Sequence, residues 1–159
     1  MTVITVNAPV GRFTTDQRRT LAQTLTDAVL VPEVGQFEPA ARVGFQVHFR
    51  DYQPDQIAVS GLLVSDFPEA PDVMVIDLAV MDADWSQAVR EVVITRLLRA
   101  MADACDLPDP QPAWWVTFRV IDEGSWGASG GVLSVLNLLD SGVFTPERAD
   151  AIRQALAIR

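Results

Sequence analysis

Few side chains in this sequence are suited to proton transfer. There is one histidine, His48, one tyrosine, Tyr52, and one cysteine, Cys105, and there is no lysine. The missing lysine excludes a Schiff-base enzyme and a phosphate-binding loop of the GxxxxGK[ST] type. A single histidine and a single cysteine also exclude a multi-histidine or cysteine-rich metal centre within one chain. General acids and bases must therefore come from aspartate, glutamate, His48, Tyr52 or the N-terminal amine.

The composition indicates one folded domain. The chain has 159 residues, of which 49% are hydrophobic, and a formal net charge of −9. A chain of this length can bury a substantial core, and its negative charge argues against nucleic acid or an anionic membrane as a partner. No signal-peptide pattern and no apolar run of about 18–20 residues is present. We therefore expect a single domain over residues 1–159 and a cytoplasmic location.

A unit of strand, helix and strand occurs twice along the chain. The segment Val-His-Phe-Arg at 47–50 returns as Val-Thr-Phe-Arg at 116–119. An amphipathic helical stretch precedes each copy, and a short apolar strand precedes each helix. This organisation divides the chain into a first unit at about 2–62, a second unit at about 72–131, and a C-terminal helical extension at 132–159.

Local signals predict where the helices begin. Thr14 begins a capping box that Gln17 completes, and Asp84 begins the same spacing before the second helix. Thr145 precedes a proline and is the expected N-cap of the last helix. Three further segments are predicted from alternation and glycine content: a strand at 42–51, a flexible segment at 127–131 and a short helix near 132–139.

Two such units predict an α+β fold, in which two consecutive β-α-β units form a four-stranded sheet with two helices on one face, plus short C-terminal helices. The alternation of the strands places a mixed polar and aromatic set on the opposite face. This set consists of Gln46, His48, Arg50, Trp115, Thr117 and Arg119. Such a face is too aromatic to remain exposed and too polar to form a dry core. We therefore expect other copies of the chain to cover it.

At this point the chain resembles the tautomerase superfamily, and in particular its long-chain branch with malonate semialdehyde decarboxylase and cis-3-chloroacrylic acid dehalogenase. The resemblance covers roughly residues 2–131. Gly11-Arg12 before a capped helix is similar to the helix start of the tautomerases. The segment 46–49 is similar to the second strand of the dehalogenase, and 122–126 is similar to an Asp/Trp/Gly segment of the decarboxylase. The resemblance implies a homotrimer that uses no metal and no cofactor.

The chain departs from this family at two places. The family uses an N-terminal proline, exposed by removal of the initiator methionine, as its general base or acid. This chain has Thr2 there, and its primary amine could still accept a proton after removal of Met1, whereas a retained Met1 would displace the amine by one residue. The two arginines that bind the substrate carboxylate in the family have no counterpart in 81–84, which reads Met-Asp-Ala-Asp.

The resemblance implies two catalytic residues, Thr2 and Glu123, and four residues that bind a small carboxylate substrate, namely Arg12, Gln46, His48 and Trp126. Structural alternatives stand beside these roles: a surface ion pair for Arg12, a hydrogen-bonded strand residue for His48 and an interface anchor for Trp126. Two functions therefore remain open. One is an enzyme with weak classical activity that tautomerises, decarboxylates or hydrates a small enolisable or unsaturated carboxylic acid. The other is a catalytically inactive protein that binds a small molecule or serves an assembly.

Overall fold

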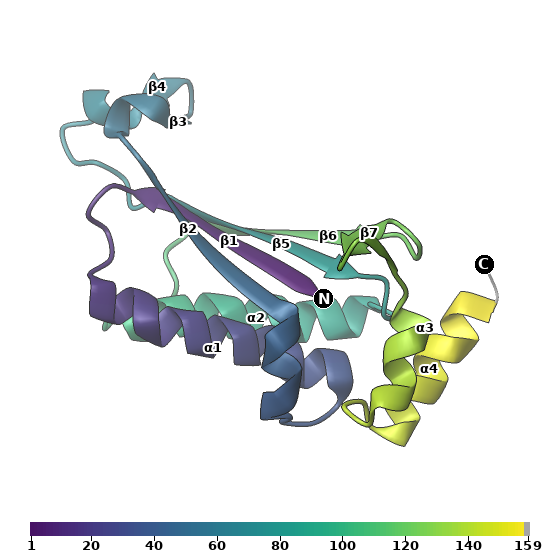
Figure 1. Cartoon of the computed structure of the whole chain (residues 1–159). Coiled ribbons are helices and arrows are strands. Elements are labelled where there is room, and N and C mark those ends of the chain that lie inside the picture. Colours follow the sequence, from purple (N-terminus) through teal and green to yellow (C-terminus); the bar gives the residue numbers. More distant parts are fainter. Residues whose placement is uncertain (158–159) are drawn as a thin grey trace.

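A four-stranded mixed sheet forms the centre of the fold, and two long helices cover one of its faces (Figure 1). The computed structural model describes residues 1–157. The strand order is β2-β1-β5-β6. These strands are β1 (Thr2–Pro9), β2 (Phe45–Tyr52), β5 (Met74–Met81) and β6 (Trp114–Ile121). The expected α+β architecture is confirmed.

The sheet has parallel pairs at its edges and an antiparallel pair at its centre. β1 runs parallel to β2, with Thr2 opposite Phe45, and β5 runs parallel to β6. β1 and β5 are antiparallel, with Thr2 opposite Val80. Each parallel pair is joined through a helix, as a β-α-β crossover requires. This register places the first residues of the chain beside the ends of β5 and β6 and the start of β2.

Both long helices begin at a side-chain cap. α1 (Thr15–Val34) has the expected capping box, in which the Thr14 hydroxyl accepts a hydrogen bond from the Gln17 amide at 3.2 Å. The expectation that Asp84 caps α2 (Gln87–Ala104) is wrong, because Ser86 is the N-cap. Asp84 instead has a φ of 51° and lies in the loop before the helix, where tertiary contacts hold it.

The core lies between the sheet and the two helices. It is built from alternate residues of the central strands and from helix residues at three- and four-residue spacing, as amphipathic elements require. Its fully buried members include Ile4, Val6, Leu21, Leu25, Val29, Ile76, Leu78, Val93, Leu97 and Met101. Two apolar residues near these elements lie outside the core. Val92 of α2 is 45% exposed, and Val43 is 91% exposed because β2 begins only at Phe45.

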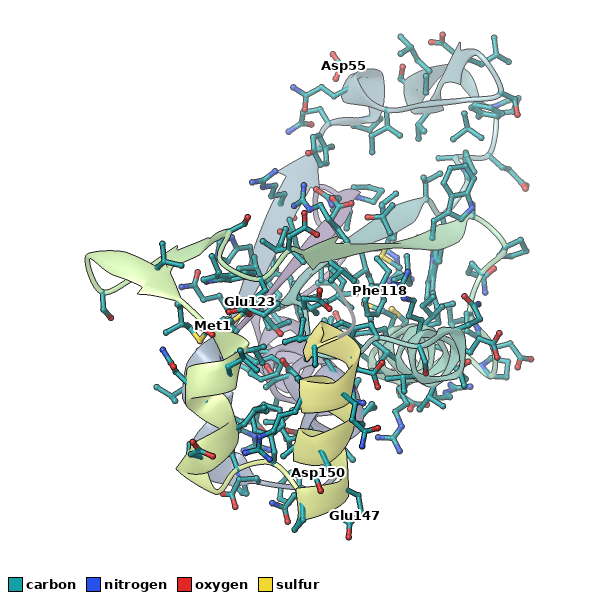
Figure 2. The ribbon with its side chains drawn as sticks, turned by 90° about the vertical axis from the view of Figure 1, so that its right-hand side faces the viewer. Met1, Asp55, Phe118, Glu123, Glu147 and Asp150 are labelled. Atoms are coloured by element: carbon teal, nitrogen blue, oxygen red, sulfur yellow. The ribbon has the colours of Figure 1, made fainter. Side chains whose placement is uncertain are left out.

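Short elements complete the chain. They are η1 (Pro39–Gly44), η2 (Pro54–Gln56), β3 (Ala58–Val59), β4 (Leu62–Leu63), η3 (Val64–Asp66), β7 (Trp126–Ala128), β8 (Gly131–Leu133), α3 (Val135–Leu138), η4 (Leu139–Ser141) and α4 (Pro146–Ala157). The arm that contains Asp55, β3 and β4 stands away from the rest of the chain in both views (Figures 1 and 2). α3 and α4 pack at the other end of the sheet, near the N-terminus (Figure 1).

Two expectations about the C-terminal part need correction. The glycine segment expected to be flexible forms an antiparallel hairpin of β7 and β8, turned by Ser129 and Gly130 at positive φ. The helix expected near 132–139 is reduced to α3, because residues 131–133 pair in the hairpin instead. The last helix begins as expected, with the Thr145 hydroxyl accepting a hydrogen bond from the Arg148 amide at 3.3 Å.

The sheet face opposite the helices is only partly covered. Trp115 is 67% exposed on it. A chain of polar contacts crosses all four strands, from Tyr52 through Asn7 and Asp77 to Thr117. We refer to this surface, opposite α1 and α2, as the open face.

In the described part of the chain, no helix is both long and apolar enough to cross a membrane.

Candidate functional site

The N-terminus is held inside the fold. The Met1 carbonyl accepts a hydrogen bond from the Met81 amide at 3.1 Å, and Thr2 is only 1% exposed. The Met1 amine lies 3.9 Å from one carboxylate oxygen of Glu33. The Thr2 hydroxyl donates to the other oxygen of the same carboxylate at 3.4 Å. An amine, a hydroxyl and a carboxylate therefore meet at the start of β1.

Glu33 is placed by the last turn of α1. The helix ends just beyond it at Gly35, whose φ of 85° allows its amide to bond the Val31 carbonyl at 3.0 Å. Glu33 is 4% exposed. Burial raises the pKa of the Glu33 carboxyl above its ordinary value, and the Met1 amine, the Thr2 hydroxyl and Arg148 oppose this rise. A raised pKa moves this carboxyl toward the neutral range, where it can both accept and donate a proton.

Arg148 of α4 bonds the backbone at Glu33 and the loop before α2. Its guanidinium donates to the carbonyl of Glu33 at 3.1 Å, to the carbonyls of Ala83 and Asp84, and to the Asp84 carboxylate at 3.1 Å. Its side chain is 12% exposed. This arginine is occupied by protein oxygens, so it is a structural cation that fastens α4 to the loop before α2.

A cavity of about 190 Å³ opens beside the amine. Its polar lining consists of Met1, Glu33 and Ser141. The rest of the lining is mainly apolar and includes Val34, Ala41, Val43, Phe45, Leu138 and Phe144. An engineered apolar cavity of about 150 Å³ binds benzene, so a cavity of this size suits a ring or a short branched chain. We call this cavity the N-terminal cavity.

The N-terminal cavity combines features that ligand sites commonly have. It is mostly apolar, and it has a few polar groups at one end. A buried carboxyl with a displaced pKa is a mark of acid–base sites, although structural ion pairs share this mark. The amine supplies a positive charge and Glu33 supplies a proton acceptor. The arrangement can therefore bind a small molecule by its apolar part and move a proton at its polar end.

A second hollow of about 480 Å³ lies on the open face. It is lined by Gln46 and Trp126, two of the residues expected to bind substrate, together with Thr5, Asp77 and Arg119. His48 lies on the same face, and its Nε2 is 3.0 Å from the Gln46 amide oxygen. The structure thus brings Gln46, His48 and Trp126 onto one surface, on the other side of the sheet from Glu33.

The structure does not bring Arg12 to Thr2 within one chain. Arg12 follows the last residue of β1, so the length of that strand separates the two. Its guanidinium forms a two-point pair with Asp72, with both N–O distances at 2.9 Å, and lies 5.8 Å from the ring centre of Trp114. Hydrogen bonding to Asp72 raises the pKa of Arg12. Within a single chain, Arg12 is therefore a packed ion-pair partner.

Glu123 has a structural partner. Its carboxylate accepts a hydrogen bond from the Val135 amide at 3.1 Å, which satisfies a free donor at the start of α3. Figure 2 shows Met1 and Glu123 at the end of the sheet nearest α3. Glu123 does not line the N-terminal cavity as the described residues form it. The single cysteine, Cys105, is half-buried, and burial raises its pKa, which disfavours a thiolate.

Glu33 and Arg148 were not predicted from the sequence. A signal for Glu33 was present, because Leu21, Leu25, Val29 and Glu33 recur every four residues on the buried stripe of one helix. An acid that continues an apolar stripe must either end the stripe or be buried with partners. Arg148 had no comparable signal, because its partners lie more than sixty residues away in the sequence.

Comparison with known proteins places this fold. No protein-family model matches the sequence, and no curated protein matches it. A crystal structure of N1, a member of the cis-3-chloroacrylic acid dehalogenase family, has a TM-score of 0.68 at 18% identity, and the match covers 96% of this chain and 99% of that chain. A wild-type symmetric trimer of Q0 fused 4-OT has a TM-score of 0.65 at 19% identity, covering 84% and 96%.

A third neighbour was solved in an inactivated form. Pt0534, solved after inactivation by 2-oxo-3-pentynoate, has a TM-score of 0.65 at 15% identity, and the match covers 86% of this chain and 98% of that chain. The three neighbours share nearly their whole length with this chain, although few residues are identical. The doubled β-α-β unit, the strand order and these neighbours together show that the chain has the fold of the tautomerase superfamily.

Proposed function

We propose that this protein transfers a proton on a small enolisable or unsaturated carboxylic acid, in a tautomerisation, decarboxylation or hydration, at the N-terminal cavity. One observation carries the proposal: a terminal amine lies 3.9 Å from a buried carboxylate at the polar end of an apolar cavity. The amine or its neighbour carries the proton in place of the N-terminal proline. The substrate carboxylate meets the positive amine, because Arg148 is occupied and Arg12 is remote.

Ketonisation of phenylenolpyruvate, followed by its ultraviolet absorbance, tests this function. The phenyl ring suits a cavity of about 190 Å³. We expect a rate above that of buffer, but well below that of a proline-bearing tautomerase, because general acid–base catalysis of this kind contributes roughly 10²–10⁴-fold. A preparation that keeps an uncleaved N-terminal tag displaces the amine and serves as the control. A rate equal to that of buffer for the native N-terminus would contradict the proposal.

Chemical labelling gives a second test of the same site. 2-Oxo-3-pentynoate inactivates Pt0534 and carries an alkyne that a nucleophilic amine can attack. We expect the native chain to gain the mass of one inhibitor and peptide mapping to place it on the first residue. Intact mass of the unlabelled protein also shows whether Met1 or Thr2 is that residue. Labelling elsewhere, with the terminal peptide unmodified, would argue against a reactive amine.

A second candidate function is binding without catalysis. The observation that favours it is that two arginines are held by protein carboxylates: Arg148, beside the site, binds Asp84, and the more distant Arg12 binds Asp72. A protein of this kind would hold phenylpyruvate in the N-terminal cavity without turnover. Calorimetric titration with phenylpyruvate, alongside the ketonisation assay, separates the two candidates, because binding without a rate above buffer supports the second.

We also propose that the protein is a homotrimer. The Q0 fused 4-OT neighbour is a symmetric trimer, and this chain leaves the open face with Trp115 67% exposed. Arg50 and Arg119 lie on this face and form no salt bridge within residues 1–157. Association of three copies through this face would bury Trp115 and give both arginines access to acids of a neighbouring copy.

A further inference from the structure

We propose that Glu33 is the catalytic proton carrier of the N-terminal cavity and that the terminal amine binds the substrate carboxylate. This inference rests on the proposed function and assigns the two roles that it leaves open. The substrate class is a small 2-oxo acid, or its enol, with an apolar side chain of about the size of a benzene ring.

The position of Glu33 supports the role of proton carrier. Glu33 is 4% exposed and is one of the residues that line the N-terminal cavity, so a molecule bound there lies beside it. One of its oxygens accepts the Thr2 hydroxyl at 3.4 Å, and the other lies 3.9 Å from the amine. The second distance is too long for a direct hydrogen bond. This oxygen therefore remains available to a substrate hydroxyl.

The charges around the cavity support the role of the amine. Arg148, whose guanidinium donates to the Glu33 carbonyl, is bound by three carbonyls in all and by the Asp84 carboxylate. Among the described residues that line the cavity, the Met1 amine is the sole cationic group. A substrate carboxylate that enters the cavity must pair with this amine or lose its hydration without compensation. An amine engaged in this way is not free to act as the base.

Glu33 alone can remove and return the proton that the reaction transfers. For an enol substrate, the Glu33 carboxylate removes the proton of the enol hydroxyl. The oxygen then forms the carbonyl double bond, and the electron pair of the carbon–carbon double bond takes the same proton back from the Glu33 carboxyl to form a carbon–hydrogen bond. The glutamate returns to its carboxylate form, and no oxidant or further reactant is used. Burial of Glu33 supports this step, because its raised pKa makes the carboxylate a stronger base than an exposed one.

The fit of the apolar walls defines the side chain of the substrate. Val34, Phe45, Leu138 and Phe144 supply apolar surface around a volume of about 190 Å³. An apolar cavity of about 150 Å³ holds benzene, so a phenyl or branched alkyl group fits, whereas a second carboxylate at that end would be buried without a partner. The cavity therefore favours phenylenolpyruvate over 2-hydroxymuconate, which carries a carboxylate at each end.

Steady-state kinetics of Glu33→Gln tests the assignment. With phenylenolpyruvate, we expect kcat to fall about 10²-fold or more, while KM changes little. Glu33→Asp should recover part of kcat, because it restores a carboxylate that is one methylene shorter. Glu91→Gln is the matched control, since Glu91 is an exposed glutamate of α2 far from the cavity lining. The uncleaved N-terminal tag should mainly raise KM.

The pH profile distinguishes a catalytic role from a structural one. In the wild-type protein, kcat should rise with pH as the Glu33 carboxyl ionises, above the ordinary value of 4.5. Glu33→Asp should keep this rise at a changed midpoint, and Glu33→Gln should lose it. If Glu33→Gln does not fold, the wild-type and Glu33→Asp profiles carry the test. A wild-type kcat that stays constant as pH rises above 4.5 would overturn the assignment of Glu33 as the proton carrier.

The outcomes separate this inference from the proposed function. An active wild-type enzyme whose folded Glu33→Gln variant keeps its kcat would overturn the role of Glu33 and leave the proposed function standing. Faster turnover of 2-hydroxymuconate than of phenylenolpyruvate would overturn the substrate class. A wild-type protein that matches buffer with both substrates would overturn the proposed function, and the assignment of Glu33 with it.

Discussion

Arg148 and Asp84 are 64 residues apart in the sequence and form an ion pair of 3.1 Å. The same guanidinium also bonds the carbonyls of Ala83, Asp84 and Glu33. One side chain of the last helix therefore joins the end of α1 to the loop before α2. Because Glu33 and the N-terminal cavity lie at this junction, the C-terminal helix contributes to the shape of the site.

Replacing Arg148 should destabilise the contact of α4 with the end of α1 and the loop before α2. We expect Arg148→Met to lower the free energy of unfolding by about 2–3 kcal/mol, because a nearly buried cation with several oxygen partners is removed. Arg153→Met is the matched control on the same helix. Arg153 pairs with Asp140 and Asp150 at the surface, where such pairs contribute about 0–1 kcal/mol. Denaturant unfolding measures both variants, and equal losses would contradict the prediction.

The pH dependence of stability should depend on Glu33. Its pKa is raised in the folded chain, mainly by burial, and is about 4.5 when unfolded. Between these two values the folded state binds more protons, so this contribution to stability is full below pH 4.5 and is lost as pH rises through the folded pKa. Glu33→Gln should remove this decline. Chemical denaturation across this pH range checks it, with Glu91→Gln expected to keep the wild-type slope.

Substitution of Gly35 should disturb the contact between α1 and α4. A Cβ atom at this position would lie 2.6 Å from the Thr145 hydroxyl oxygen, and the backbone φ is 85°. We expect Gly35→Ala to lower the unfolding free energy by more than the roughly 1–2 kcal/mol of left-handed strain alone. Gly142→Ala isolates the strain, since its φ is 82° and no atom lies within 4 Å. If thermal unfolding shows equal losses of stability for Gly35→Ala and Gly142→Ala, the clash with Thr145 makes no contribution.

The open face should mediate trimer formation. Sedimentation should give a mass of about three times the 17.4 kDa chain. Trp115→Asp places a charge on the edge strand β6 of this face and should shift the protein toward monomer, because an unpaired buried charge strongly disfavours association. Val92→Asp changes an exposed residue on α2, on the other side of the molecule, and should leave the mass unchanged. A wild-type mass near one chain would exclude the trimer.

Thr2→Pro should raise the ketonisation rate when Met1 is removed. The substitution replaces the charged primary amine, which pairs with the substrate carboxylate, by a secondary amine of the kind that acts as general base in the tautomerase superfamily, so we expect an increase of at least about tenfold. Thr2→Ala also permits methionine removal but leaves a primary amine, and it should show no increase. Intact mass must confirm the terminus of each preparation. A Thr2→Pro enzyme with the wild-type rate would show that the identity of the amine does not limit this reaction.

The architecture could be predicted from the sequence because its signals are local. The capping box at Thr14 and the N-cap at Thr145 depend on residues within one helical turn. The periodicity of each segment indicates strand or helix by itself, and the doubling of the unit indicates a four-stranded sheet. The start of α2 was predicted wrongly at Asp84, since a bond to a distant arginine competed with the local cap.

Less of the candidate site could be predicted from the sequence. Strand alternation placed Gln46 and His48 on the open face, whereas Trp126 was named only through the family resemblance. In the structure, Gln46 and Trp126 line one hollow on this face. Arg12 follows the expected helix start, but its pairing with Asp72 joins residues 60 positions apart. A sequence pattern identifies which residues can form an ion pair, whereas the partner depends on which segments pack together.

The sequence by itself determined the four main strands, the two long helices, their order and the proton-carrying residue types that are available. Only the tertiary structure decided that the Glu33 carboxylate accepts a hydrogen bond from Thr2, 31 residues away in the sequence, and that Arg148 bonds the Glu33 carbonyl. The physical reason is the range of the interactions. Helix caps and hydrophobic periodicity act within a few residues, whereas a buried carboxylate acquires its partners and its raised pKa only when distant segments exclude water around it.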